Sequence, residues 1–193
     1  MIKTKQDYKK YLLQDALALR EVKRKYPRLF TDYIWRYQRI LRKCEYQKTY
    51  SGLKKLLCMP LIIVNRIRFN KMSMLLGFSI PFGVFEEGLS IAHYGCITVN
   101  TEAKVGKNCR IHEGVNIGAT NGSDKAPIIG NNVFIGTGAK IIGDITIADD
   151  VAIGANAVVV KSITEPGTTW AGIPAKKVSS NNSHSNLSPY LSL

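Results

Sequence analysis

The second half of the chain carries an aliphatic residue at every sixth position, and this period limits the fold more than any other feature. The residues on the period are Val99, Val105, Ile111, Ile117, Ile129, Ile135, Ile141, Ile147, Ile153 and Val159. A second series of small or branched residues follows four positions later: Ala103, Cys109, Val115, Ala139, Val151 and Ala157. Neither a helix nor a simple alternating strand predicts a period of six. Hexapeptide repeats are typical of a parallel β-helix, in which three repeats form one coil of about 18 residues.

The chain divides into three parts on the basis of these patterns. Thr4 to Asp7 has the form of a helix capping box, and apolar residues then recur at helical spacing. We therefore expect a basic helical region at 1–70, a β-helix domain at 71–178 and a disordered polar tail at 179–193. Residues 118–128 read GATNGSDKAPI and cannot fill two repeats, which predicts a loop that leaves the β-helix.

The positive charge of the chain lies entirely in the first part. Residues 1–70 hold 18 Lys and Arg against 5 Asp and Glu, and the remainder holds 9 against 9. Such a surplus is open to three interpretations: a solvated helical surface, attraction to an anionic membrane surface, or attraction to an acidic polymer. No nucleic-acid-binding motif accompanies the charge, so we expect no nucleic-acid partner.

The sequence gives no sign of export or of a membrane span. The four cysteines show no CxxC pairing, which favours a reducing compartment. The N-terminal residues lack the apolar stretch of a signal peptide, and the apolar run at 56–64 is too short to cross a bilayer. We therefore expect a cytoplasmic protein whose basic region contacts a membrane surface at most peripherally.

Two of the three histidines are candidates for chemistry. His93 and His112 are 19 residues apart, one coil plus one residue, so we expect them on nearly the same face of adjacent coils. Counting back from Val99 places His93 at an inward position, so either the first coil is out of register or His93 is a core residue. His184 lies in the expected tail.

The segments IAHYGCITVN, IGTGAKIIG, IGANAVV and AGIPAK give the chain a resemblance to the hexapeptide acyltransferases, specifically the serine acetyltransferase branch, over about residues 75–179. The resemblance implies a left-handed β-helix, a homotrimer or dimer of trimers with active sites between subunits, and acetyl-CoA as co-substrate. His93 aligns with the catalytic base of the family. An imidazole can take the proton of an attacking hydroxyl, with backbone N–H groups stabilising the oxyanion, so we expect direct transfer without a covalent enzyme intermediate. His112 is expected to orient the acceptor or His93.

The resemblance also implies where CoA binds. The expected groove is formed by Gly136, Thr137, Gly138, Ala139 and Ala155, with Lys161 and Lys176 facing the phosphates and Lys140 and Lys177 as weaker candidates. We expect no metal, because only two usable histidines are present and a three-histidine zinc site of the kind found in γ-type carbonic anhydrases needs three.

The acceptor is where the chain departs from the serine acetyltransferase branch. Ala92 stands where that branch has an acid before the catalytic histidine, Lys125-Ala126 replaces an Arg-His pair, and the helical region is shorter. Serine needs a carboxylate for its ammonium and a cation for its carboxylate, and only Asp124 and Lys125 offer replacements. The sequence therefore favours a sugar hydroxyl of a surface-polysaccharide precursor, with serine as the alternative acceptor. A non-catalytic hexapeptide scaffold is the alternative of another class, and the intact groove motifs argue against it.

Overall fold

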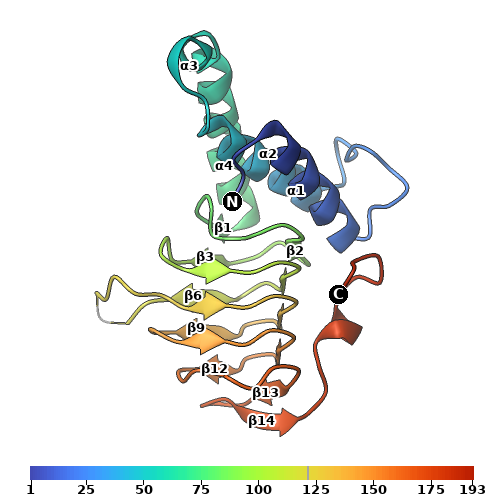
Figure 1. Cartoon of the computed structure of the whole chain (residues 1–193), viewed down its shortest axis with the longest axis vertical. Coiled ribbons are helices and arrows are strands. Elements are labelled where there is room, and N and C mark those ends of the chain that lie inside the picture. Colours follow the sequence, from blue (N-terminus) through green and yellow to red (C-terminus); the bar gives the residue numbers. More distant parts are fainter. Residues whose placement is uncertain (121) are drawn as a thin grey trace.

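The computed structural model describes residues 1–120 and 122–193 and shows a β-helix covered at one end by helices (Figure 1). The helices are α1 (Lys5–Ala18), α2 (Tyr33–Gln47), α3 (Gly52–Leu57) and α4 (Met59–Leu76). Thr4 and Asp7 form the capping box that begins α1. None of the described helices is long and apolar enough to cross a membrane.

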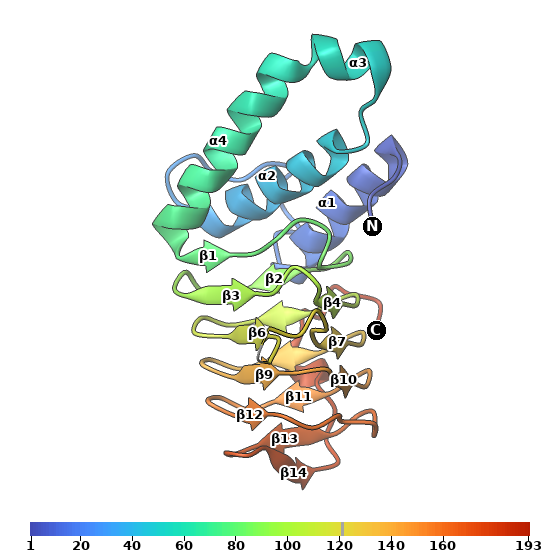
Figure 2. The same ribbon diagram turned by 90° about the vertical axis from the view of Figure 1, so that its left-hand side faces the viewer.

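Short strands form the three flat faces of the β-helix (Figure 2). The first face contains β1 (Phe78–Ser79), β3 (Ile97–Val99), β6 (Asn116–Gly118), β9 (Lys140–Ile142) and β12 (Val158–Val159). The second contains β4 (Lys104–Val105), β7 (Ile128–Ile129) and β10 (Thr146–Ile147). The third contains β2 (Ser90–Ile91), β5 (Arg110–Ile111), β8 (Phe134–Ile135), β11 (Ala152–Ile153), β13 (Thr169–Ala171) and β14 (Lys176–Ser179). Every pairing is parallel except β13 with β14.

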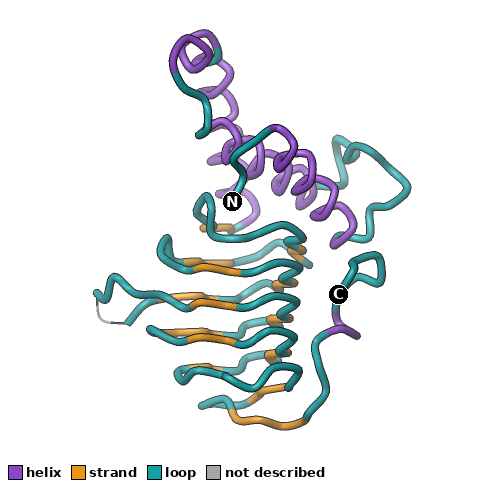
Figure 3. The backbone as a smooth tube through the Cα atoms, viewed as in Figure 1, coloured by secondary structure: helices purple, strands orange, loops and turns teal. Residues whose placement is uncertain are grey.

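The aliphatic period marks the core of the β-helix, as the sequence predicted. All ten residues on the period are buried, with at most 4% of their surface exposed. Between the later coils the pairing follows the expected spacing of 18 residues, as in Ile141 with Val159. Val105 pairs instead with Ile129, so this coil is six residues longer. The extra residues leave as a loop between β6 and β7, which Figure 3 shows projecting from the coils.

A slip in the first coil settles the position of His93. Ile91 pairs with Ile111, whereas Val99 pairs with Ile117, so two residues more than the repeat allows lie between Ile91 and Val99. They belong to the turn at 92–96, and His93 is exposed there. The expectation of an inward position from strict counting is therefore wrong, and the alternative that the first coil is out of register is confirmed.

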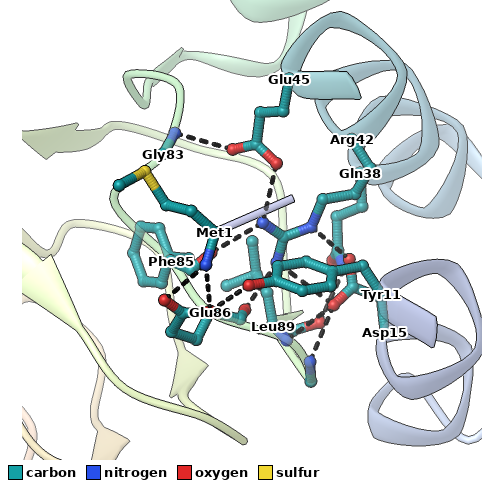
Figure 4. Close-up of polar contacts among 11 residues, drawn as sticks. Met1, Tyr11, Asp15, Gln38, Arg42, Glu45, Gly83, Phe85, Glu86 and Leu89 are labelled. Carbon is teal, nitrogen blue, oxygen red and sulfur yellow. Dashed lines mark hydrogen bonds and ion pairs between the residues drawn. The ribbon is translucent and has the colours of Figure 1, made fainter. Parts of the chain in front are cut away.

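The helices are joined to the first coil by a buried charge cluster (Figure 4). The fully buried Arg42 of α2 pairs with Asp15 (Nε to Oδ2, 2.8 Å) and Glu45 (Nη1 to Oε2, 3.0 Å). Its guanidinium also donates to the carbonyl oxygens of Phe85 (2.8 Å) and Glu86 (2.7 Å). The chain that leads into β2 and His93 is therefore held by the helical region.

Two predicted domain limits differ from the structure. The boundary at residue 70 falls inside α4, which continues to Leu76. The polar tail contains a short 3-10 helix at His184–Asn186, and Leu187 is only 3% exposed. Figure 3 shows this tail returning from β14 toward the helices. The sequence predicted disorder because the tail has few apolar residues, but side-chain hydrogen bonds to the coils and to α1 hold it in place.

Candidate active site at one corner of the β-helix

One corner of the β-helix carries both the histidines and the glycine-containing turns. The corner follows the inward aliphatic residue of the third face, and the coils are joined there by backbone hydrogen bonds from each coil to the next. The donors are the N–H groups of Ala92, His112, Gly136 and Gly154, which bond to the carbonyl oxygens of Ile111, Ile135, Ile153 and Trp170. The imidazoles therefore lie at one end of a column of turns, with the glycine turns one and two coils further along.

The structure brings the two histidines together. The ring centroids of His93 and His112 are 5.7 Å apart, with an angle of 68° between the ring planes. Phe134 of the next coil lies 5.3 Å from the His112 ring, and the hydroxyl oxygen of Thr137 lies 3.4 Å from His112 Nδ1. His93 is exposed and His112 is half-buried, so His93 is the imidazole with freer access to a ligand.

Charged groups flank the histidine pair on both sides. Glu113 Oε2 lies 4.0 Å from His112 Nδ1, is buried and has no hydrogen-bond partner. A hydrogen bond from its own backbone N–H keeps the pKa of the Glu113 carboxyl below its ordinary value, and both imidazoles contribute in the same direction. Burial lowers the pKa of His112, and the positive charge of Arg110 lowers it further. The site therefore combines a carboxylate, two imidazoles and a guanidinium.

The sequence analysis missed Glu113 and Arg110. Glu113 follows His112 directly, and Arg110 precedes it by two residues, so both were within reach of a repeat-based argument. Arg110 and His112 share the outward face of one strand because side chains alternate along it. Glu113 was harder to recognise, because it lies in a turn whose conformation the repeat does not specify.

Three side chains of this site also have the composition of a metal site. One ligand atom each from His93, His112 and Glu113 lies within 4.8 Å of the others. Two histidines and a glutamate form a known zinc ligand set, which differs from the three-histidine set that the sequence excluded. A metal here would occupy the nitrogen atoms that proton transfer requires, so it would compete with acid–base chemistry.

The turns expected to contact CoA lie along the same corner, but their glycines have a structural reason of their own. A Cβ atom at Gly136 would lie 2.8 Å from the Ala155 backbone nitrogen, so the stacking of coils requires glycine there. Gly138 has a positive φ of 71°, which also favours glycine. The Ala139 side chain lies in the core, so only its backbone could contact a ligand. Thr137 is half-buried and Ala155 is exposed.

The four candidate lysines fall into two groups. Lys177 pairs with Glu165 (Nζ to Oε1, 2.5 Å), and Lys140 donates to the Gly114 carbonyl oxygen. Lys161 and Lys176 are exposed, and neither forms an ion pair within residues 1–120 and 122–193. The second group therefore has its charge available for a phosphate.

The loop candidates for binding an amino-acid acceptor are less suitable. Lys125 forms an exposed ion pair with Asp144 (Nζ to Oδ2, 2.9 Å), so its charge is already partnered. Asp124 is exposed in the same loop. The charges nearest the imidazoles come instead from Glu113 and Arg110.

Comparison with known proteins agrees with this arrangement of coils and turns. The family model "Bacterial transferase hexapeptide (six repeats)" matches residues 126–161. Serine acetyltransferase of Helicobacter pylori (strain J99) is 33% identical over 148 residues, which cover 70% of this chain and 86% of that protein. The chain belongs to the serine acetyltransferase branch of the hexapeptide acyltransferases. It is therefore a left-handed β-helix protein and an acyltransferase that uses acetyl-CoA.

Solved structures of serine acetyltransferases extend the likeness to most of the chain. The enzyme of Brucella abortus strain S19 in complex with coenzyme A is 25% identical, with a TM-score of 0.67, and covers 92% of this chain and 70% of that one. The enzyme of Neisseria gonorrhoeae in complex with serine is 25% identical, with a TM-score of 0.65, and covers 89% and 69%. The likeness to serine acetyltransferases thus includes the helices as well as the β-helix.

Proposed function

We propose that this chain transfers the acetyl group of acetyl-CoA to the hydroxyl of serine, with His93 as general base. This departs from the sugar acceptor that the sequence favoured, because the relatives that match the chain are serine acetyltransferases. The observation that carries the proposal is the buried, unpartnered carboxylate oxygen of Glu113 beside the histidine pair. It supplies the negative charge whose family position is occupied here by Ala92.

The charges around the histidines match those of an amino acid. The Glu113 carboxylate would receive the ammonium group of serine, and the Arg110 guanidinium, with its stronger preference for planar anions, would receive the carboxylate. The hydroxyl of a serine held in this way lies near the imidazoles. Charge-assisted hydrogen bonds of this kind are the ones that fix orientation most strongly.

The reaction then needs one essential imidazole. His93 takes the hydroxyl proton as the oxygen attacks the thioester carbonyl, and backbone N–H groups of the adjoining turns stabilise the tetrahedral oxyanion. As the intermediate collapses, the C–S bond breaks and His93 returns the proton to the CoA sulfur. His112 and Thr137 hold the neighbouring side of the site, and Lys161 and Lys176 contact the phosphates of CoA. A homotrimer or dimer of trimers would complete each site with a neighbouring subunit.

Kinetics with serine analogues tests the acceptor directly. We expect release of CoA thiol with L-serine, a much weaker reaction with ethanolamine, which lacks the carboxylate, and with 3-hydroxypropionate, which lacks the ammonium. Glu113→Gln should raise KM for serine at least 10-fold and leave KM for acetyl-CoA unchanged, because the interaction is with the acceptor alone. Glu102→Gln is the matched control at an exposed turn position. Equal rates with serine and 3-hydroxypropionate would contradict the role of Glu113.

A sugar hydroxyl remains the second candidate acceptor because of one observation. Tyr94, directly after His93, is 71% exposed and lines a cleft with Ala92 and Trp35. An exposed aromatic ring beside the base is suited to packing on the apolar face of a sugar, and it has no evident use with serine. A panel of nucleotide sugars in the same thiol-release assay distinguishes the two acceptors. Loss of activity on Tyr94→Ala with a sugar but not with serine would favour this candidate.

A further inference from the structure

Helices α3 and α4 carry an exposed apolar surface that the acetyl-transfer reaction does not use. Its apolar side chains are between 49% and 84% exposed: Leu53, Leu56, Leu57, Leu61, Ile63, Val64, Ile67, Met74 and Leu75. Figure 2 shows α3 and the adjoining end of α4 projecting away from the coils. We call this set of residues the α3–α4 surface.

This surface is unusual for a helix in contact with water. A surface helix normally has one apolar stripe that packs on the core and a polar opposite face. In α4 only Asn65, Phe69 and Leu76 are buried, and the other apolar residues are spread around its circumference. Contiguous exposed apolar surface of this kind marks an interaction site.

The charge of this segment is of one sign. No aspartate or glutamate occurs between Glu45 and Glu86, while the same stretch holds the six cations Lys48, Lys54, Lys55, Arg66, Arg68 and Lys71. All except Lys48 belong to α3 or α4. A stretch of 40 residues without an acid cannot neutralise these charges from within.

We propose that the α3–α4 surface docks on an anionic lipid membrane, lying on the bilayer without crossing it. Apolar side chains would enter the headgroup and acyl boundary, and the cations would meet anionic headgroups. Both features of the surface, its apolar area and its single sign of charge, are satisfied by this one partner. None of the described helices is long and apolar enough to span a bilayer.

A second copy of the chain fits the surface less well. A two-fold contact brings the same patch of both copies together, so the cations of one copy would face those of the other with no acid between residues 46 and 85 to pair with them. The membrane is therefore the partner whose charge complements the surface.

Sedimentation with lipid vesicles tests the proposal on the full-length chain. We expect binding to vesicles of phosphatidylglycerol and phosphatidylcholine, weak binding to phosphatidylcholine alone, and loss of binding as NaCl is raised, because salt screens the exposed charges. The variant Leu56→Glu/Leu57→Glu should bind the anionic vesicles at least 10-fold less. Val178→Glu, at an equally exposed apolar residue in β14, should bind as the parent chain does.

Two further measurements separate docking from misfolding and from self-association. Leu56→Glu/Leu57→Glu should retain the circular dichroism spectrum, the rate of CoA release with a soluble acceptor, and the oligomeric mass of the parent chain. A fall in mass would identify the surface as an interface between copies and overturn the proposal. Absence of binding to anionic vesicles at low salt, or equal binding by parent and variant, would also overturn it.

Discussion

Replacing Arg42 tests how strongly the helical region is coupled to the coil that carries His93. In Arg42→Met the chain loses the hydrogen bonds of the guanidinium to Asp15, Glu45 and two carbonyl oxygens. Removing one partner of a buried ion pair costs about 3–5 kcal/mol, because the remaining charge is left without compensation. The lower end applies here, since Asp15 keeps its hydrogen bonds from the Gly88 and Leu89 N–H groups (both 2.9 Å).

The expected change in melting temperature follows from this loss. In a chain of this size each kcal/mol shifts Tm by roughly 2–4 °C, so a loss of about 3 kcal/mol lowers Tm by roughly 6–12 °C. Thermal unfolding followed by circular dichroism measures the shift. Lys10→Met is the control, because it removes an ion pair with Glu87 in which the lysine is largely exposed (2.9 Å). A fall in Tm no larger than that of the control would refute the reasoning.

The pH dependence of the variant gives a second, independent result. Burial raises the pKa of Asp15, and the attraction of Arg42 opposes that rise. Without Arg42 the Asp15 pKa rises further above its value in the unfolded chain, so the folded variant binds a proton more tightly than the unfolded one. The deficit in stability is therefore largest above the folded pKa and shrinks as the pH falls toward the usual carboxyl range. Adding Asp15→Asn to Arg42→Met should recover part of the stability at neutral pH, and no recovery would contradict the charge argument.

Four further outcomes follow from the site. His93→Ala should lower kcat about 10²–10⁴-fold without changing KM for acetyl-CoA, whereas His112→Ala should lower it less; normal activity of folded His93→Ala would exclude it as the base. Lys176→Ala should raise KM for acetyl-CoA at unchanged kcat, and an equal fall in kcat would place it nearer the reacting carbonyl. Gly136→Ala should lower the free energy of unfolding by roughly 1–3 kcal/mol, because its Cβ would meet the Ala155 backbone, which calorimetry can measure. Zn²⁺ should inhibit in a manner relieved by a chelator, and inhibition that persists in the Glu113→Gln variant would assign the effect to another site.

The sequence predicted the coils well because each repeat reports independently on the same geometry. Every inward aliphatic residue occupies an equivalent position, so the period remains visible across the interruption between Ile117 and Ile129. The pairing of His93 with His112 was predictable for the same reason. The extra length of the turn at 92–96 was not, because two additional residues change the register locally and leave no periodic trace.

The contacts of the helical region could not be predicted, because they join residues far apart in the chain. Arg42 and Asp15 lie in two different helices, and their backbone partners lie near residues 85–89. Each of these residues alone resembles an ordinary surface charge. The same limit applied to Glu113, whose importance depends on a turn conformation that brings its carboxylate to the imidazoles.

The returning C-terminal segment links two parts of the molecule that a solenoid would otherwise leave independent. His184 Nε2 contacts Asp150 Oδ1 (2.8 Å) in a late coil, and the Ser188 hydroxyl donates to the Leu17 carbonyl oxygen (2.6 Å) at the end of α1. In a simple stack each coil interacts only with its neighbours, so the terminal coil can open alone. Here the segment connects that end to the helices at the other. Amide hydrogen exchange in the last coil and in α1 should therefore slow or quicken together, and cutting the chain after residue 180 should make the two ends exchange separately.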